Sequence, residues 1–403
     1  MQIINAVVTE AKELWKGGNG PPLVAIATGW GLLLGVRMVY PILLPYFRET
    51  FSLSLTVAGL LITILWLGSA VGQLPGGILA DRYSERVVMA VSVTLVGLAL
   101  TLVVAAPTAL ILFAATGVVG LGQSLYPIAR ITLLSQLYPD RIGSALGVTM
   151  ATGDLGQTFL PPIAGVLAAT LAWQAGLSFL IPLLLTAGIG IWIILPTQPR
   201  ANTEEKLLSG ERIRLLFSEL RESNLLFVTL ILTLFFLSWQ AFTGFFPTYL
   251  VEVKGFSPST AGLLFAIFFA FGVVVKPVAG AAYDRIGMRR ALIMVLAGPV
   301  VGLGVLPFID GFWPLAGATI IISTMLGSGA ITQSFLANAF SADIRGTGLG
   351  VVRTTTATIG ATGPVIFGTI ADRGFFNEGY LLLSGALLVV ILLTLRLPQV
   401  APE

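Results

Sequence analysis

The stretch GILADRYSER at Gly77–Arg86 returns 203 positions later as GAAYDRIGMRR at Gly280–Arg290. The same offset relates further identical residues across 23–196, namely Tyr46 to Tyr249, Gly59 to Gly262, Gly147 to Gly350, Pro161 to Pro364 and Gly165 to Gly368. A single offset that holds over so many Gly, Pro and Asp positions indicates a duplicated unit. A repeat of this length decides the architecture before any local motif is considered.

Composition places the chain in a membrane. Of its 403 residues, 56% are hydrophobic and 10% are charged, and the mean hydropathy is +0.95, whereas soluble globular domains carry roughly 25% charged residues. The chain has no cysteine and no histidine, which excludes disulfide scaffolds, thiolate metal sites and serine-histidine chemistry. An intramembrane aspartyl protease would need two buried acids, and the sequence offers one. We therefore expect no enzymatic activity, no metal, no cofactor and no nucleic-acid partner.

Apolar stretches of about twenty residues, each able to cross roughly 30 Å of hydrocarbon as a helix, predict six spans in the first half and six in the second. The first six lie near 23–47, 55–79, 86–106, 109–137, 143–168 and 174–196. The repeat places the others near 226–250, 258–282, 289–309, 313–340, 346–370 and 377–397. The predicted fold is all-α, with two six-helix bundles related by a pseudo-twofold axis.

Four segments follow from this pattern. An interfacial helix is expected at 1–22, because charged and apolar residues alternate there at helical spacing without a signal-peptide cleavage site. The two bundles occupy 23–196 and 225–403, and a charged cytoplasmic linker joins them at 197–224. We expect a functional monomer, since two fused bundles suffice.

The 22 Lys and Arg residues fix the predicted orientation. Fifteen fall in segments on the side of the two termini, three fall in loops on the opposite side, and four lie within spans. Because positive residues favour the cytoplasmic side, we expect a multi-pass protein of the plasma membrane with both termini in the cytoplasm.

The two repeated loops resemble the signature G-x-x-x-D-R-x-G-R-R that follows the second helix in the major facilitator superfamily. The first copy departs from it at Ser84 and Glu85, where glycine and a basic residue are usual. The resemblance implies alternating access and a cytoplasmic gate, formed here by Asp81, Arg82, Arg86, Asp284 and Arg285. The alternative is that these charges only set the topology.

Span 5, GVTMATGDLGQTFLPPIAG at Gly147–Gly165, is similar to the antiporter motif of that superfamily, but Leu160 and Ala164 replace two glycines. Together with YPIARITLLSQLYPDRIGSALG at Tyr126–Gly147, it is more similar to the anion:cation symporter branch. Members of that branch carry sugar acids, phosphate or acidic amino acids.

Four cations lie within predicted spans, Arg37, Arg130, Lys276 and Arg353, against one acid, Asp154. A charge at the bilayer centre costs roughly 2.5 to 3.5 kcal/mol on insertion scales, so such residues normally face a watery cavity and serve transport. The surplus of positive charge predicts a small anionic solute.

The repeat offset pairs three of these cations with amides: Gln240 with Arg37, Gln333 with Arg130 and Gln73 with Lys276. A transporter built of repeats can thus make one asymmetric site where they meet. Arginine grips a carboxylate or phosphate with two parallel hydrogen bonds, and the amides add neutral ones.

Further residues are candidates for the same site. Tyr40, Gln123 and Tyr126 share helix faces with the arginines, and Thr243 with Gln240; ordinary helix packing is the alternative. We assign Lys276 and Arg353 to gating. Asp154 either carries a coupling proton or forms an ion pair with Arg353 or Lys276.

The sequence therefore predicts a secondary transporter that moves a small organic anion, with proton coupling left open. One alternative is a proton-driven exporter of lipophilic drugs, favoured by the antiporter-like span 5. A second is a nitrate or nitrite porter, favoured by Gln73 and Lys276 at positions that resemble its paired arginines. A third is a transporter-derived sensor that binds without carrying.

Overall fold

The computed structural model describes residues 13–72, 79, 83–197, 223–332 and 345–397, and within these ranges the regular structure is entirely helical. Most of the expected interfacial helix at 1–22 and of the linker at 197–224 lies outside them. Every predicted span is mainly helical where its residues are described, with short turns inside or at the ends of some spans, as at Leu125, Phe179 and Ala361, which confirms the all-α expectation.

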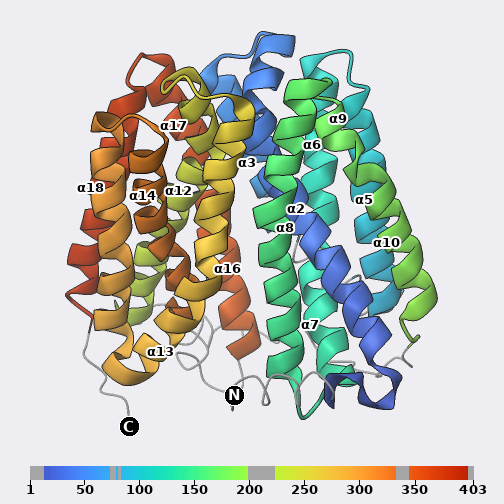
Figure 1. Ribbon diagram of the computed structural model, residues 1–403. Coiled ribbons are helices and arrows are strands. Elements are labelled where there is room, and N and C mark those ends of the chain that lie inside the picture. Colours follow the sequence, from blue (N-terminus) through green and yellow to red (C-terminus); the bar gives the residue numbers. More distant parts are fainter. Residues whose placement is uncertain (1–12, 73–78, 80–82, 198–222, 333–344, 398–403) are drawn as a thin grey trace. The chain divides into compact units, whose positions relative to one another are not determined.

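The first half contains the helices α2 (Gly20–Phe51), α3 (Leu55–Val71), α5 (Glu85–Val104), α6 (Ala109–Ser124), α7 (Tyr126–Leu137), α8 (Ile142–Thr170), α9 (Ala175–Ser178) and α10 (Leu180–Ile194), shown in Figure 1. The second half contains α12 (Ser223–Glu252), α13 (Pro258–Val305), α14 (Phe312–Ser323), α16 (Arg345–Gly360), α17 (Gly363–Asp372) and α18 (Phe376–Thr394). Short 3-10 turns lie at Lys16–Gly18, Leu306–Phe308 and Thr324–Gly327.

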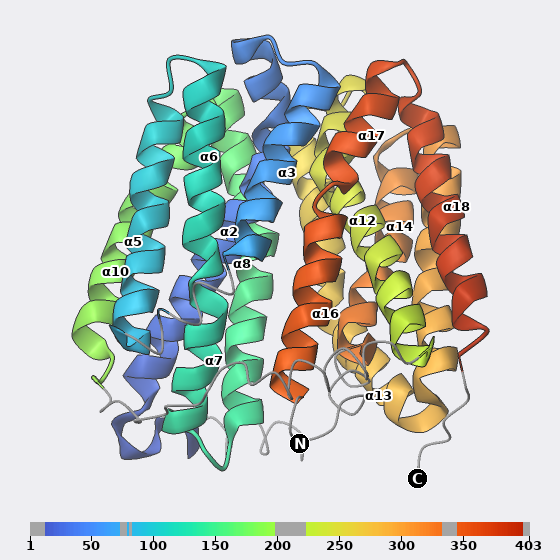
Figure 2. The ribbon, with the colours of Figure 1, turned by 180° about the vertical axis from the view of Figure 1, so that it is seen from behind.

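Among the described residues, eight helical segments are long and apolar enough to cross a membrane, and Leu55–Val71 is a shorter apolar helix. One of the eight, Pro258–Phe308, covers two predicted spans, and another, Ala109–Leu137, joins α6 to α7. Figure 2 shows α7 following α6 along one line.

The chain divides into two compact units. Unit 1 comprises Met1–Leu43 and Ile64–Ala201, and unit 2 comprises Leu44–Thr63 and Asn202–Glu403. Both α2 and α3 therefore pass from one unit to the other, and the segment that joins them packs with the second half of the chain.

Within unit 1, α2 and α8 approach each other through glycine. A Cβ atom on Gly156 would lie 2.0 Å from the carbonyl oxygen of Gly31, and one on Gly31 would lie 2.8 Å from the carbonyl oxygen of Thr152. Small residues allow such backbone approach between membrane helices. Close backbone contact at these glycines packs α2, which carries Arg37, against α8, which carries Asp154.

One position of the repeated loop motif has a similar backbone conformation in both copies. Gly287 interrupts α13 with φ 76° and ψ 168°, and its repeat partner Ser84 precedes α5 with φ 98° and ψ 148°. L-residues with a side chain rarely adopt these angles. The positive φ at this position is therefore kept even where serine replaces glycine.

Candidate functional site

Arg37 on α2 is held by neutral partners from three directions. Its Nε donates to Oε1 of Gln123 at 2.9 Å, and its Nη2 donates to the hydroxyl of Ser69. The guanidinium carbon lies 4.6 Å from the ring centroid of Trp66. Gln123 is itself oriented, because its Nε2 donates to the carbonyl of Leu33 at 3.1 Å. Two residues predicted to share a site, Arg37 and Gln123, are thus in direct contact.

Arg130 on α7 is buried and is also held by an aromatic face. Its Nη1 donates to the hydroxyl of Thr149 at 2.9 Å, and its guanidinium carbon lies 4.0 Å from the ring centroid of Trp30. Its Nε is buried and has no hydrogen-bond partner among the described residues. A buried donor without an acceptor costs free energy until an acceptor arrives.

Neither Arg37 nor Arg130 forms an ion pair with an acid in the part of the chain that the structure describes. Hydroxyls, an amide and indole rings orient the two guanidinium groups but supply no formal negative charge. Unit 1 therefore holds two sheltered positive charges that its described side chains do not neutralise.

The two predicted tyrosines are fully buried and make internal hydrogen bonds. Tyr40 accepts from the hydroxyl of Thr116 at 3.3 Å, and Tyr126 donates to the carbonyl of Ile26 at 2.8 Å. The ring of Tyr126 also stacks on Trp30, with centroids 6.2 Å apart and planes 20° apart. Their contact with a solute stays a prediction, and their role in this structure is to support neighbouring groups.

In unit 2, Gln240 on α12 is 2% exposed, and its Oε1 is buried with no hydrogen-bond partner among the described residues. Thr243, one turn further on, is fully buried and donates to the carbonyl of Trp239 at 2.9 Å. Gln240 thus presents a carbonyl acceptor, whereas the hydroxyl proton of Thr243 is already used. The other predicted amides, Gln73 and Gln333, lie outside the described residues.

Asp154, the predicted coupling acid, is buried on α8 at 7% exposure. The amide of Gln157 donates to its Oδ1 at 3.4 Å. Of the two cations weighed as its partners, Lys276 on α13 is half-buried and Arg353 on α16 is exposed. The choice between a coupling proton and an ion pair stays a prediction.

The predicted gating residues are described only in part. Arg86 donates to the carbonyl of Leu195 at 3.4 Å and to the hydroxyl of Thr197 at 3.0 Å, and it lies 4.7 Å from the ring centroid of Trp192. Those contacts anchor the start of α5 to the end of α10. Asp284 and Arg285 are exposed on α13. Asp81 and Arg82 lie outside the described residues.

Sequence reasoning missed the groups that hold the arginines, which are Trp30, Trp66, Ser69 and Thr149. Aromatic and hydroxyl residues at helical spacing usually belong to ordinary packing, so the pattern alone gives them no distinction. The signal that could have found them is indirect: an arginine inside a span needs neighbours that accept its hydrogen bonds or stack on its guanidinium group.

A second missed cluster lies in unit 2. Asp372, beyond the predicted span 346–370, accepts from the backbone N–H groups of Leu55 at 2.6 Å and Thr56 at 2.8 Å. It thereby caps the start of α3 as a local N-cap residue would. Partial burial alone would raise the pKa of Asp372, but the hydrogen bonds outweigh it and hold that pKa below its usual range. Arg48 and Glu252 form an ion pair in the same unit.

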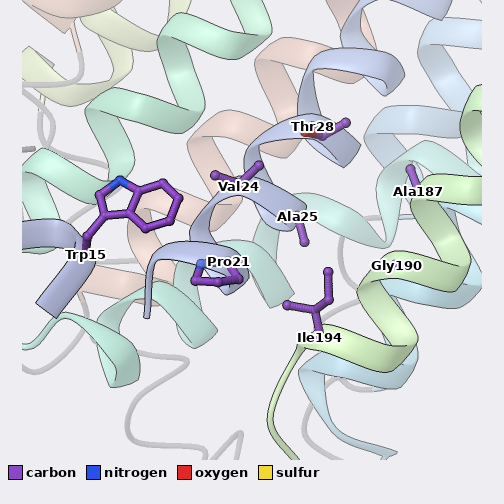
Figure 3. A pocket seen from close by; sticks show the side chains of 8 residues that line it. All are labelled: Trp15, Pro21, Val24, Ala25, Thr28, Ala187, Gly190 and Ile194. Atoms are coloured by element: carbon purple, nitrogen blue, oxygen red, sulfur yellow. The ribbon is translucent and has the colours of Figure 1, made fainter. Parts of the chain in front are cut away.

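Figure 3 shows a cavity of about 330 Å³ in unit 1, between the start of α2 and α10. It is lined by Trp15, Pro21, Val24, Ala25, Thr28, Ala187, Gly190 and Ile194. None of these eight side chains is charged, and none belongs to the predicted site. The cavity therefore lacks the groups that would bind an anion.

Comparison with known proteins adds the family. The model of the Major Facilitator Superfamily matches residues 26–364. The chain is 25% identical to a hexuronate transporter of Bacillus subtilis, over 89% of this chain and 90% of that protein. It is 28% identical to a 3-(3-hydroxy-phenyl)propionate transporter of Escherichia coli, over 88% and 89%. It is also 26% identical to a nitrite extrusion protein of Bacillus subtilis, over 66% of each chain.

The solved structure of the nucleoside transporter NupG has the same fold. It superimposes with a TM-score of 0.76 and 14% identity, over 94% of this chain and 98% of that one. The match of family model, apolar helices and fold identifies a multi-pass integral membrane protein.

Proposed function

This chain belongs to the Major Facilitator Superfamily, and from that premise we propose that it is a secondary active transporter that moves a small organic anion by alternating access. The observation that carries the proposal is the pair Arg37, half-buried, and Arg130, buried, whose hydrogen-bond partners among the described residues of unit 1 are all neutral. A buried charge is costly unless it is paired. The transported anion supplies the missing partner for as long as it is bound.

The chemistry of the site favours a carboxylate with hydroxyl groups. Guanidinium groups bind carboxylates through paired, charge-assisted hydrogen bonds. In unit 2, the Oε1 of Gln240 has no hydrogen-bond partner among the described residues and is able to accept from a hydroxyl group. Two relatives, the hexuronate and the hydroxyphenylpropionate transporters, are named for carboxylates that carry hydroxyl groups. We extend that substrate class to this chain.

Three finer features belong to the same proposal. Asp154 is the acid that carries a coupling proton, since it is the only acid in the interior of a predicted span, whereas Glu378 lies at the very start of the span 377–397. Both termini lie in the cytoplasm, because the positive residues gather on that side. The protein works as a monomer. Arg86, Asp284 and Arg285 act in the cytoplasmic gate together with Asp81, Arg82, Lys276 and Arg353.

Uptake into proteoliposomes tests the proposal directly. Purified protein is reconstituted, and uptake of labelled D-glucuronate and 3-(3-hydroxyphenyl)propionate is compared between wild type, Arg130→Ala and Arg37→Ala. Arg396→Ala is the matched control, because it removes an exposed arginine at the end of the last helix. We expect wild type and Arg396→Ala to transport at least one of the two carboxylates and both site variants to lose uptake while remaining monodisperse. Full uptake by Arg130→Ala and Arg37→Ala would refute the assignment.

Nitrate or nitrite transport is the second candidate, and the similarity to the nitrite extrusion protein favours it. Uptake assays separate the two. An organic anion transporter takes up a labelled carboxylate even in excess nitrate, whereas a nitrate porter takes up nitrate, and excess nitrate suppresses any carboxylate uptake. A lipophilic-cation exporter would need a membrane acid where Arg37 and Arg130 stand. Counterflow of labelled solute would exclude a sensor that binds without carrying.

A further inference from the structure

The two site arginines use opposite edges of their guanidinium groups. In Arg37, the Nε–Nη2 edge is occupied, since Nε donates to Gln123 and Nη2 donates to Ser69. In Arg130, the occupied atom is Nη1, which donates to Thr149. The Nε–Nη2 edge of Arg130 has no acceptor among the described residues, and its Nε is buried.

This open edge has the geometry that a carboxylate requires. The N–H bonds of Nε and Nη2 run parallel in the guanidinium plane, so that they meet the two oxygens of one carboxylate at the same time. Arg37 retains only its Nη1 side for a solute, because its paired edge is already bonded within unit 1. Arg130 is therefore able to offer a carboxylate two parallel N–H bonds, whereas Arg37 offers only its Nη1 group.

Trp30 fixes the plane in which the open edge lies. The guanidinium of Arg130 stacks on its ring at 4.0 Å, and the ring of Tyr126 stacks on Trp30 as well. Tyr126 is anchored in turn by its hydrogen bond to the carbonyl of Ile26. On α8, a Cβ atom at Gly153 would lie 2.8 Å from Nε1 of Trp30, so glycine at this position leaves the indole its place.

We infer that Trp30 is a positioning residue that presents the Nε–Nη2 edge of Arg130 as the two-point anchor for the substrate carboxylate, with Arg37 as a supporting charge. The inference rests on the proposed function. An indole face holds a guanidinium flat without competing for its hydrogen bonds, since the attraction comes from the ring quadrupole. The anchor is thus formed before the substrate enters, and less ordering is needed on binding.

The test compares Trp30→Leu and Trp30→Phe with wild type in D-glucuronate uptake. Trp30→Leu removes the aromatic face, and we expect KM to rise about 3- to 30-fold, the range that spans exposed and desolvated cation–π contacts, while kcat changes less than twofold. Trp30→Phe restores a smaller face and should lie between the two. Trp313→Leu, the same substitution at a side chain that is 81% exposed, should match wild type.

The outcomes separate this inference from the proposed function. Wild-type protein that takes up none of the carboxylates contradicts the proposed function itself. Wild-type uptake with an unchanged KM in Trp30→Leu, or a fall in kcat alone, overturns only the role of Trp30.

A lysine pair tests the division between the arginines. Lysine keeps the charge but lacks the paired edge. We expect Arg130→Lys to raise KM at least tenfold and Arg37→Lys to raise it less. Equal losses, or a larger loss at Arg37, would overturn the assigned anchor.

Discussion

Replacing Ser84 with glycine is expected to stabilise the protein. Ser84 has φ 98° and ψ 148°, close to the angles of Gly287 at the equivalent position of the second repeat. A residue with a side chain pays about 1–3 kcal/mol to hold such a conformation. The Oγ of Ser84 is also buried with no hydrogen-bond partner among the described residues. Glycine removes both costs without changing the turn.

The size of the effect follows from two opposing contributions. Relief of backbone strain gains about 1–3 kcal/mol, and the greater freedom of glycine in the unfolded chain costs about 0.4–1 kcal/mol. The net gain is therefore roughly 0.5–2 kcal/mol, before any contribution from the lost hydroxyl. By the scaling of unfolding entropy with chain length, the apparent Tm should rise by about 1–2 °C.

Fluorescence-monitored unfolding of the detergent-solubilised protein measures this shift. Ser135→Gly serves as the matched control, because Ser135 is exposed and lies within α7. Glycine inside this helix should lower the free energy of unfolding by about 0.5–1 kcal/mol and so lower the Tm. The reciprocal Gly287→Ser should lower it too. A Tm for Ser84→Gly that falls as far as the control would refute the account of strain.

Two further predictions concern helix contacts. Gly156→Ala should lower the Tm and the monodisperse yield, because its Cβ would lie 2.0 Å from the carbonyl oxygen of Gly31. Gly190→Ala should lower neither, because open space surrounds its Cβ. Equal behaviour of the two variants in gel filtration would contradict the close approach of the helices. Because the pKa of Asp372 is lowered, its capping contact is present above about pH 4 and is lost as the pH falls through the lowered pKa. Asp372→Asn should speed hydrogen exchange of the two capped amides at the start of α3 at pH 7, and unchanged protection would exclude the charge effect.

The repeat and the hydropathy of the chain predicted most of the fold. They could not predict the break inside the fourth span, where α6 ends at Ser124 and α7 begins at Tyr126. Pro127 lacks an amide hydrogen and so removes one helical hydrogen bond at this point, but apolar composition alone does not register that loss. The same composition continues across Gly287, where the backbone turns within α13.

The candidate site was predictable in its charges and unpredictable in its surroundings. Arg37 and Arg130 stand out in the sequence because a cation inside a span is expensive. Trp30 and Ser69 do not stand out, because each meets its arginine across two different helices, a contact that the spacing along one helix does not reveal. The open edge of Arg130 depends on hydrogen-bond directions, which no pattern of residue types contains.

Calorimetric titration of the detergent-solubilised protein with D-glucuronate tests the central claim, that sheltered arginines in unit 1 bind an organic anion. Removing one partner of a buried, hydrogen-bonded charge pair costs about 2–5 kcal/mol, which corresponds to at least about a 30-fold loss of affinity. We predict saturable binding by wild type and a loss of this size in Arg130→Ala, with Arg396→Ala unchanged. Equal affinity of wild type and Arg130→Ala would contradict the claim.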